Sequence, residues 1–429
     1  MRLQTVLNAV LSWTSLGTRP SPYQHHVDVN ALGNLSPYHP SPSVAGVEAE
    51  LPGDCSVEQV ILLHRHGSRG PITGEDDLIL GLVDTLDAAW DAIQEADLPP
   101  NLRFLKAGYK YDLEPEALSI MGRQQLFNHG VEFALRYPHI STTTVLSSPV
   151  ERVIESARFF ALGDLGPDIK DVYFMTVEDL DVPVNWILPW VACPNWNIEL
   201  EPALEWSSHY IPQITDRLNS LLPGVYLSYD NAHGALLACP YDLAARNESP
   251  WCNVFLPHEL RAFEYELDLG MSGMGAYLLP DNMGPLLGSV YVNKLIERLT
   301  NANGDAKELY LEFGHDVSIL LILAAMGLNE DIPPLSGDHI RPHRRFRTSE
   351  QTPFAAQMIW EKFSCAKSFK GPQVRLLLND ATYPLSICEK SRMDKRYGTC
   401  SLHEFIKANS YSTGVQYGDA MWNASCGSA

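Results

Sequence analysis

A chain of 429 residues is too long for one simple core and indicates a large domain with a second lobe. Its hydrophobic content of 45% and aromatic content of 10% are typical of a globular protein and argue against disorder. Because 52 acidic residues against 31 basic ones leave a net charge of −21, nucleic acid and anionic membranes are unfavourable partners. A small anion can still bind where cations are concentrated locally.

The first part of the chain predicts a leader followed by an extended arm. Residues 6–16 form a mildly apolar run after one early arginine, a weak version of a secretory signal. Residues 18–53 are rich in Pro, Ser, Gly and His, which is typical of extended chain. Further along, uninterrupted apolar stretches stay shorter than the ~20 residues that a transmembrane helix needs.

Strands and helices then alternate up to about residue 163. The aliphatic stretch Val57–His64 predicts a buried strand that ends in a glycine-containing turn. Apolar residues recur at helical spacing from Leu78 to Ile93, and this helix is expected to stop at Pro99–Pro100. The next predicted elements are a helix over 119–137, a strand over 142–149 and a helix over 151–163.

The second half of the chain predicts a helical middle followed by more strands. From Cys193 to Leu299 the signals are helical, interrupted by Pro and Gly. Residues 308–313 predict a strand, 317–328 an apolar helix and 373–380 a further strand. Strand–turn–helix units at both ends that enclose a helical middle predict an α/β sheet domain with a helical insertion.

Three of the predicted strand ends carry charged residues. The segment RHGSRGP, residues 65–71, follows the first strand, Arg152 lies near a helix start, and His315 and Asp316 precede the apolar helix. Ligands of α/β sheets bind beyond the carboxyl ends of strands. Arginine forks match phosphate oxygens, a histidine can attack phosphorus, and a carboxylic acid can protonate a leaving oxygen. The pattern therefore predicts a site for phosphate chemistry.

RHGSRGP resembles the RHGxRxP signature of the histidine acid phosphatase family, and the His–Asp pair at 315–316 resembles the family's second signature. The resemblance extends from about residue 35 to residue 426 and is nearest to fungal phytase-like acid phosphatases. It implies an α/β fold: a mixed-sheet α/β sandwich domain, similar to phosphoglycerate mutase, with a smaller inserted all-α domain. We expect a leader and arm over 1–50, the catalytic domain over 51–75, 108–195 and 290–429, and the helical insert over 76–107 and 196–289.

The resemblance also implies the roles of the site residues. His66 is expected to be the nucleophile that becomes phosphohistidine, and Asp316 the proton donor. The residues expected to hold the phosphate oxygens are Arg65, Arg69, Arg152 and His315. No cofactor or metal ion is expected, because these cations already neutralise the transferring phosphoryl group.

Other roles stay open for several charged residues. An arginine on a helix, such as Arg152, ordinarily lies on a solvated face, and the pair His315–Asp316 also fits a helix cap. His64, inside the strand, is expected to be a packed neighbour of the nucleophile. The basic run from Arg341 to Arg347 is typical of a solvated loop.

The eight cysteines lack both CxxC pairs and zinc-ligand spacing, which favours four disulfides in an oxidising compartment over free thiols. Their order resembles that of the family and implies the pairs Cys55–Cys365, Cys193–Cys426, Cys239–Cys252 and Cys388–Cys400. Asn34, Asn247 and Asn423 lie in sequons and are candidate glycosylation sites. These features predict a secreted glycoprotein.

The predicted function is that of a secreted acid phosphatase acting on small phosphate monoesters. A phytase is the alternative, and three departures from the usual fungal phytase pattern argue against it. Glu75–Asp77 follow the signature where many members are lysine-rich, Gly70 replaces a common tyrosine, and Val317 replaces a common Asn or Thr.

Two further readings have less support. A pseudoenzyme that binds phosphorylated ligands without turnover is disfavoured by the intact His66, Arg69 and Asp316. A mutase of the wider superfamily is disfavoured by the His–Asp motif, the cysteine pattern and the chain length. The oligomeric state is left open.

Overall fold

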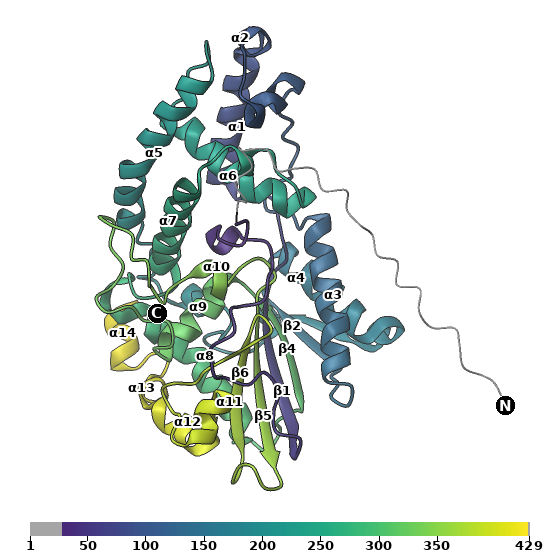
Figure 1. The fold of residues 1–429 in the computed structure, drawn as a ribbon. Helices are drawn as coiled ribbons and strands as arrows, with labels where there is room; N and C mark the ends of the chain where they lie inside the picture. Colours follow the sequence, from purple (N-terminus) through teal and green to yellow (C-terminus); the bar gives the residue numbers. More distant parts are fainter. Residues whose placement is uncertain (1–27, 428–429) are drawn as a thin grey trace, which may run out of the picture.

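One mixed sheet of eight strands organises the computed structural model, which describes residues 28–427 (Figure 1). The strand order is β3-β2-β4-β1-β5-β6-β7, and β8 pairs with β6. Neighbours from β3 to β1 are parallel, and those from β1 to β8 are antiparallel. The strands are β1 (Cys55–Arg65), β2 (Thr144–Ser147), β3 (Tyr173–Thr176), β4 (Leu309–Gly314), β5 (Gln357–Cys365), β6 (Gln373–Leu378), β7 (Ala381–Tyr383) and β8 (Thr399–Ser401).

Helices cover both faces of this sheet. In β1, Val60 and Leu62 pack toward α3 and α4, whereas Ile61 and Leu63 pack toward α8 and α9. A strand buried on both faces needs a continuous aliphatic run, which is why Val60–Leu63 contains no polar residue. The covering helices are α3 (Ile120–Arg136) and α4 (Glu151–Leu165) on one face and α8 (Met283–Thr300), α9 (Asp316–Ala325) and α12 (Leu402–Ala408) on the other. The predicted α/β class is therefore confirmed.

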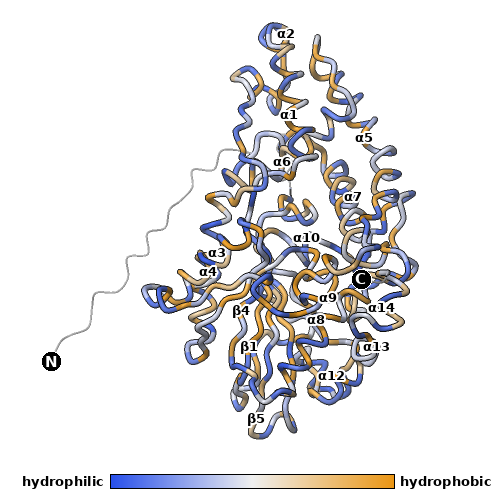
Figure 2. The backbone as a smooth tube through the Cα atoms, turned by 180° about the vertical axis from the view of Figure 1, so that it is seen from behind, coloured by the Kyte–Doolittle hydropathy of each residue, from blue (hydrophilic) through white to orange (hydrophobic). Residues whose placement is uncertain are grey.

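A second group of helices stands beyond the carboxyl end of β1 (Figure 1). Ile79, Leu82, Leu218 and Leu236 belong to its own hydrophobic cluster. In Figure 2, α1 and α5 alternate between hydrophobic and hydrophilic residues, as helices with one buried face do. The group consists of α1 (Thr73–Ala88), α2 (Trp90–Glu95), α5 (Glu201–Leu221), α6 (Tyr229–Arg246) and α7 (Pro257–Gly275).

The two groups are joined through α7. Its residues Leu260 and Phe263 belong to the helical cluster, whereas Leu269 and Met271 join a cluster with residues of α8 and α9. The predicted boundary between residues 289 and 290 falls inside α8, which is one continuous helix. The division of the chain into domains stays a prediction.

Several element boundaries differ from the expected ones. The single helix predicted over 78–93 is two helices, because the chain leaves helical geometry at Ala89 (φ −97°, ψ 15°). At the predicted stop, Pro100 instead starts the 3-10 helix η2 (Pro100–Ala107). The strands β3, β5, β7 and β8 were not predicted, and β5 lies beside β1 in the middle of the sheet.

The arm predicted as extended chain contains a buried turn. The 3-10 helix η1 (Gly33–Leu35), purple in Figure 1, packs against α7 and the short helix α10 (Thr348–Gln351). Leu32 and Leu35 are at most 1% exposed. The Ser36 hydroxyl donates to the Asn30 carbonyl (3.0 Å) and accepts from the Leu32 amide (2.9 Å). The expectation of a purely extended arm is therefore wrong here; the predicted leader lies outside the described residues.

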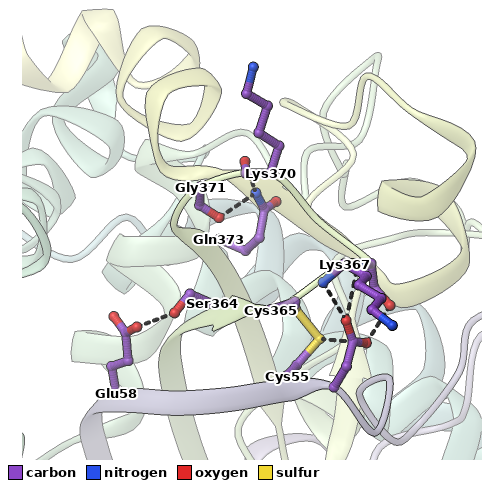
Figure 3. Close-up of a disulfide and its surroundings, with 10 residues drawn as sticks. Cys55, Glu58, Ser364, Cys365, Lys367, Lys370, Gly371 and Gln373 are labelled. Carbon is purple, nitrogen blue, oxygen red and sulfur yellow. Dashed lines mark hydrogen bonds between the residues drawn. A yellow bond between two sulfur atoms is a disulfide. The ribbon is translucent and has the colours of Figure 1, made fainter.

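The structure joins the eight cysteines in the four expected pairs. Cys55 and Cys365 link the first residue of β1 to the last residue of β5 (Figure 3). Beside this bridge, the Asp54 carboxylate accepts hydrogen bonds from the amides of Lys367 (2.6 Å) and Ser368 (2.9 Å). The other bridges connect the segment before α5 with α14 (Ala420–Cys426), α6 with the turn Trp251–Asn253, and the segment after β7 with β8.

No helix within residues 28–427 is long and apolar enough to cross a membrane. Short helices α11 (Arg392–Tyr397) and α13 (Ser410–Gly414) complete the C-terminal part around β8 and α12.

We predict that the purified protein contains no free thiol under denaturing, non-reducing conditions. Removing Cys388–Cys400, which closes a separation of 12 residues, should lower the free energy of unfolding by about 2–4 kcal/mol. Removing Cys55–Cys365, with a separation of 310 residues, should lower the free energy of unfolding further, because a longer loop gains more chain entropy on unfolding. Thiol titration and urea unfolding of the two double Cys→Ser variants test this. Several free thiols in the parent protein would contradict the pairing.

Candidate active site

Three parallel strand ends meet at one edge of the sheet. Arg65, the last residue of β1, pairs with Gly314, the last residue of β4. The backbone amide of His66 donates to the Gly314 carbonyl (3.2 Å), and the amide of Ser148, after β2, donates to the Phe313 carbonyl (3.0 Å). The three charged strand ends of the sequence therefore lie side by side.

His66 is buried and held in one tautomer. Its side chain is 2% exposed, and Nδ1 lies 2.9 Å from the Gly67 carbonyl. Because a carbonyl oxygen only accepts, Nδ1 carries the hydrogen and Nε2 keeps its lone pair. Burial and the nearby charges of Arg65, Arg152 and Arg69 hold the pKa of His66 well below its usual value. Its imidazole therefore favours the neutral form at a pH below the usual histidine pKa.

The glycines of the motif are required by close backbone contacts. A β-carbon on Gly67 would lie 2.6 Å from the Gly122 carbonyl at the start of α3. A β-carbon on Gly70 would lie 2.1 Å from the Glu114 carbonyl, so any side chain at residue 70 requires the loop at 114–117 to move. The turn after β1 therefore packs directly on its neighbours and has little freedom to shift His66.

Three arginines face this turn with buried, unused hydrogen-bond donors. The Nε groups of Arg65, Arg69 and Arg152 are buried and have no hydrogen-bond partner within residues 28–427. Burial lowers the pKa of Arg65 to about 10, although the Asp316 carboxylate opposes this shift. Burial and the neighbouring Arg69 likewise lower the pKa of Arg152. Clustered, partly desolvated cations favour an anionic ligand, and phosphate matches their geometry.

The other donors of these guanidinium groups have different partners. Arg65 donates to the carbonyls of Thr352 (2.6 Å) and Asn34 and lies 4.7 Å from the Phe354 ring centre. Arg152 pairs with Glu116 (3.0 Å), whose side chain is 50% exposed. Arg65 is therefore fixed by the scaffold, whereas Arg152 is held by a carboxylate that water can also solvate. Arg152 lies at the site rather than on a solvated face.

His315 is the N-cap residue of α9, and Asp316 is its first residue. The Nε2 atom of His315 lies 3.2 Å from the Ser148 hydroxyl, and its ring centre is 5.7 Å from that of His66. Burial lowers the pKa of His315 to about 4, with Asp316 opposing and Arg152 reinforcing the shift. Both imidazoles are therefore neutral at mildly acidic pH, and the arginines carry the positive charge.

Asp316 is an ionised group in a buried ion pair. Its Oδ2 atom lies 2.8 Å from Nη2 of Arg65 and accepts a hydrogen bond from the Asn34 amide (3.0 Å), and Oδ1 accepts from the Val317 backbone amide (2.9 Å). Burial alone would raise the pKa of Asp316, but Arg65 and Asn34 hold it at about 2. A carboxylate turned toward Arg65 does more than cap α9.

A tyrosine and a glutamate from the helical part approach the arginine cluster. The Tyr241 hydroxyl lies 3.3 Å from Arg69 and donates to the Glu75 carboxylate. Glu75 itself is 3.9 Å from Arg69, whereas Asp76 accepts from Tyr111. Of the acidic triplet after the motif, Glu75 is thus the residue that faces the cations.

Sequence reasoning missed Asn34, Ser148 and Tyr241. Ser148 lies near the end of the strand predicted over 142–149, which is a usable signal. Asn34 lies in the arm and Tyr241 inside α6; the sequon at Asn34 predicts a glycan rather than a contact with the site, and Tyr241 carries no motif. Only their contacts across 282 and 172 residues, with Asp316 and Arg69, identify them.

Two expectations about other residues need correction. Arg344, in the basic run, is buried in ion pairs with Asp268 (2.5 Å) and Glu264 (2.9 Å), so it does not belong to a solvated loop. The Asn34 side chain is buried against Asp316, so the fold cannot accommodate a glycan at this sequon. Asn247 is exposed and Asn423 partly exposed, and they remain candidate glycosylation sites.

His64 lies behind the site as a packed residue. It is fully buried, and its Nε2 atom is 3.0 Å from Nδ1 of His129. Within residues 28–427, no group of three His, Cys, Asp or Glu side chains is arranged to hold a metal ion.

Comparison with known proteins gives matches along almost the whole chain. An acid phosphatase of Schizosaccharomyces pombe is 29% identical over 428 residues, covering 92% of this chain and 90% of that protein. Phytase A of Aspergillus fumigatus is 28% identical over 446 residues, covering 94% and 92%. The crystal structure of the phytase from D. castellii has a TM-score of 0.81 and 25% identity, covering 94% of this chain and 88% of that one.

The family profile described as histidine phosphatase superfamily (branch 2) matches residues 56–379, a span that contains both charged motifs and the strands that present them. The resemblance inferred from those motifs is therefore confirmed, and the chain belongs to branch 2 of the histidine phosphatase superfamily.

Proposed function

We propose that the protein is an acid phosphatase that hydrolyses phosphate monoesters through a phosphohistidine at His66. The observation that carries this proposal is a buried imidazole, whose Nδ1 faces a carbonyl, beside three arginines with buried and unused Nε donors. A nucleophile that stays unprotonated in acid and a cluster that attracts an anion are what phosphoryl transfer at low pH requires. Relatives named as acid phosphatases and phytases support the same class of reaction.

In the first step, the Nε2 lone pair of His66 forms a bond to phosphorus while the bond from phosphorus to the leaving oxygen breaks. Arg65, Arg69, Arg152 and His315 hold the other phosphate oxygens, and Asp316 gives its proton to the leaving oxygen. In the second step, water attacks the phosphohistidine. Asp316 takes a proton from that water, the phosphorus–nitrogen bond breaks, and inorganic phosphate leaves.

The proton for the first step comes with the substrate. Because the pKa of Asp316 is held at about 2, the carboxyl group is ionised before substrate binds. A phosphate monoester carries one proton below its second pKa of about 6. Its negative charge also offsets the arginines that hold the Asp316 pKa down, so the proton can move onto the carboxylate inside the site.

Simple monoesters are the proposed substrates, with phytase activity as the alternative. Glu75 lies 3.9 Å from Arg69 on the side of Tyr241, where it repels additional phosphate groups of a highly charged substrate. A monoester has only the one phosphate that the arginines receive and does not meet this repulsion.

Secretion is proposed from the disulfides. Four bridges join the cysteines, and such bridges persist in oxidising compartments. Acidic surroundings outside the cell also suit a nucleophile that stays neutral at low pH.

The roles of nucleophile and acid can be separated with two substrates. We expect His66→Ala to abolish turnover of every ester, because no phosphohistidine can form. Asp316→Asn should slow alkyl phosphates about 10²- to 10⁴-fold and p-nitrophenyl phosphate far less, because an aryl oxide leaves without a proton. Steady-state kinetics on both substrates measures this. Equal losses in Asp316→Asn would remove the proton-donor role.

The pH dependence should follow the ionisation of the substrate. Above the second pKa of the ester, about 6, both the substrate and Asp316 lack the proton, so kcat/KM of alkyl phosphates should fall. Toward acid, His66 stays neutral well below its usual pKa, so activity should persist there. We expect the alkaline limb to lie at lower pH for trifluoroethyl phosphate, whose second pKa is lower, than for ethyl phosphate. One common limb for both esters would contradict this proton source.

Substrate preference should respond to the charge of residue 75. Glu75→Gln removes the charge but keeps an acceptor for Tyr241, and it should raise kcat/KM on phytate relative to ethyl phosphate by about 3- to 10-fold. Asp77→Asn is the matched control, because Asp77 belongs to the same acidic triplet but is exposed. A ratio that stays constant in Glu75→Gln, or that changes equally in both variants, would show that Glu75 does not set the preference.

A further inference from the structure

The buried turn of the N-terminal arm reaches the ion pair of the active site. The side-chain amide of Asn34 donates to Oδ2 of Asp316 (3.0 Å), and the main-chain carbonyl of Asn34 accepts from Arg65. Asn34 is only 7% exposed. One residue of the arm therefore contacts both partners of the Arg65–Asp316 pair, although it precedes Asp316 by 282 positions.

Packing fixes the Asn34 amide in this position. Gly33 has a φ of +58°, and a β-carbon there would lie 2.6 Å from Cβ of Leu267 on α7. The Phe354 amide donates to the Ser36 carbonyl (3.0 Å), which attaches the other side of the turn. The Asn34 amide nitrogen also lies 3.3 Å from the sulfur of Met271. The turn is thus clamped between α7 and the segment after α10.

The two oxygens of Asp316 have unequal surroundings. Oδ2 forms the ion pair with the Arg65 guanidinium and accepts from the Asn34 amide, whereas Oδ1 accepts only the amide of Val317 among residues 28–427. A carboxyl group binds its proton on the oxygen whose lone pairs are less engaged. The Asn34 donor and the Arg65 charge on Oδ2 therefore direct the proton to Oδ1.

We propose that Asn34 is a positioning residue for proton transfer: with Arg65 it keeps Oδ2 of Asp316 as an acceptor, so that Oδ1 carries the proton for the leaving oxygen. This inference rests on the proposed function and adds to it a residue of the arm. Without the amide, the carboxyl group can rotate or bind its proton on Oδ2, where the proton faces Arg65 instead of the leaving oxygen.

The test compares alkyl and aryl esters in variants of the turn. Asn34→Leu removes the amide at similar size and should slow ethyl phosphate about 10- to 100-fold, the range for a hydrogen bond to a charged group. p-Nitrophenyl phosphate should lose less than about 3-fold, because its leaving group needs little protonation. Ser36→Ala is the matched control, since it weakens the same turn without contacting Asp316, and its alkyl-to-aryl ratio should stay that of the parent protein.

A double variant separates positioning from general damage. If Asn34 acts through Asp316, then Asn34→Leu combined with Asp316→Asn should lose no more on ethyl phosphate than Asp316→Asn alone. Equal losses of Asn34→Leu on both esters, or a double variant whose losses multiply, would overturn the inference. If Asn34→Leu does not fold, Asn34→Ala is measured by the same two criteria.

The outcome for Asp316→Asn distinguishes this inference from the proposed function. If that variant shows no difference between alkyl and aryl esters, the proton-donor role itself fails, and the inference fails with it. If Asp316→Asn shows the difference and the Asn34 variants do not, only the role of Asn34 is refuted.

Discussion

The buried ion pair between Arg65 and Asp316 is the interaction on which the site depends. Removing two charges from water costs several kcal/mol per ion, and this cost is offset only when geometry and further hydrogen bonds are good. The register of β1 against β4 places the two residues together, and Asn34 and Thr352 supply the further bonds. Loss of either charge would leave the other buried without a partner, so the strands, the arm and the segment before β5 are all constrained by this pair.

The buried histidines of the site make the folded state less stable in acid. Because burial lowers the pKa of His66 and His315, the unfolded chain binds protons more readily below about pH 6.5, and stability falls as the pH drops through that range. Asp164 and Asp242 act in the opposite direction: burial raises the pKa of both to about 6, so the folded state gains stability as the pH drops from there toward 4. The four disulfides stabilise the fold independently of such protonation.

The sequence allowed the prediction of those parts whose signals are local. His66 and Arg69 share one short motif, and strand ends followed by helix starts placed Arg152 and Asp316 at the same sheet edge. β5 was missed because its buried Glu361, paired with Arg375 (2.6 Å) on β6, interrupts the aliphatic run that marks a central strand. Asn34 was missed because its position depends on packing against α7, and its sequon suggested an exposed residue instead. Long-range polar contacts of single residues leave no periodic trace in a sequence.

The residues around His66 and the residues around Glu75 come from different parts of the molecule. The sheet edge presents His66 and the ion pair, all tied to strand ends whose backbone is hydrogen-bonded on both sides. The helical part presents Tyr241 and Glu75, which contact the site through Arg69 alone among the three arginines. A substitution in the helices can therefore alter the charge beside Arg69 while His66 and Asp316 stay in place. Arg69 is the residue through which such a change would also reach the transferred phosphate, because it belongs to both sets of contacts.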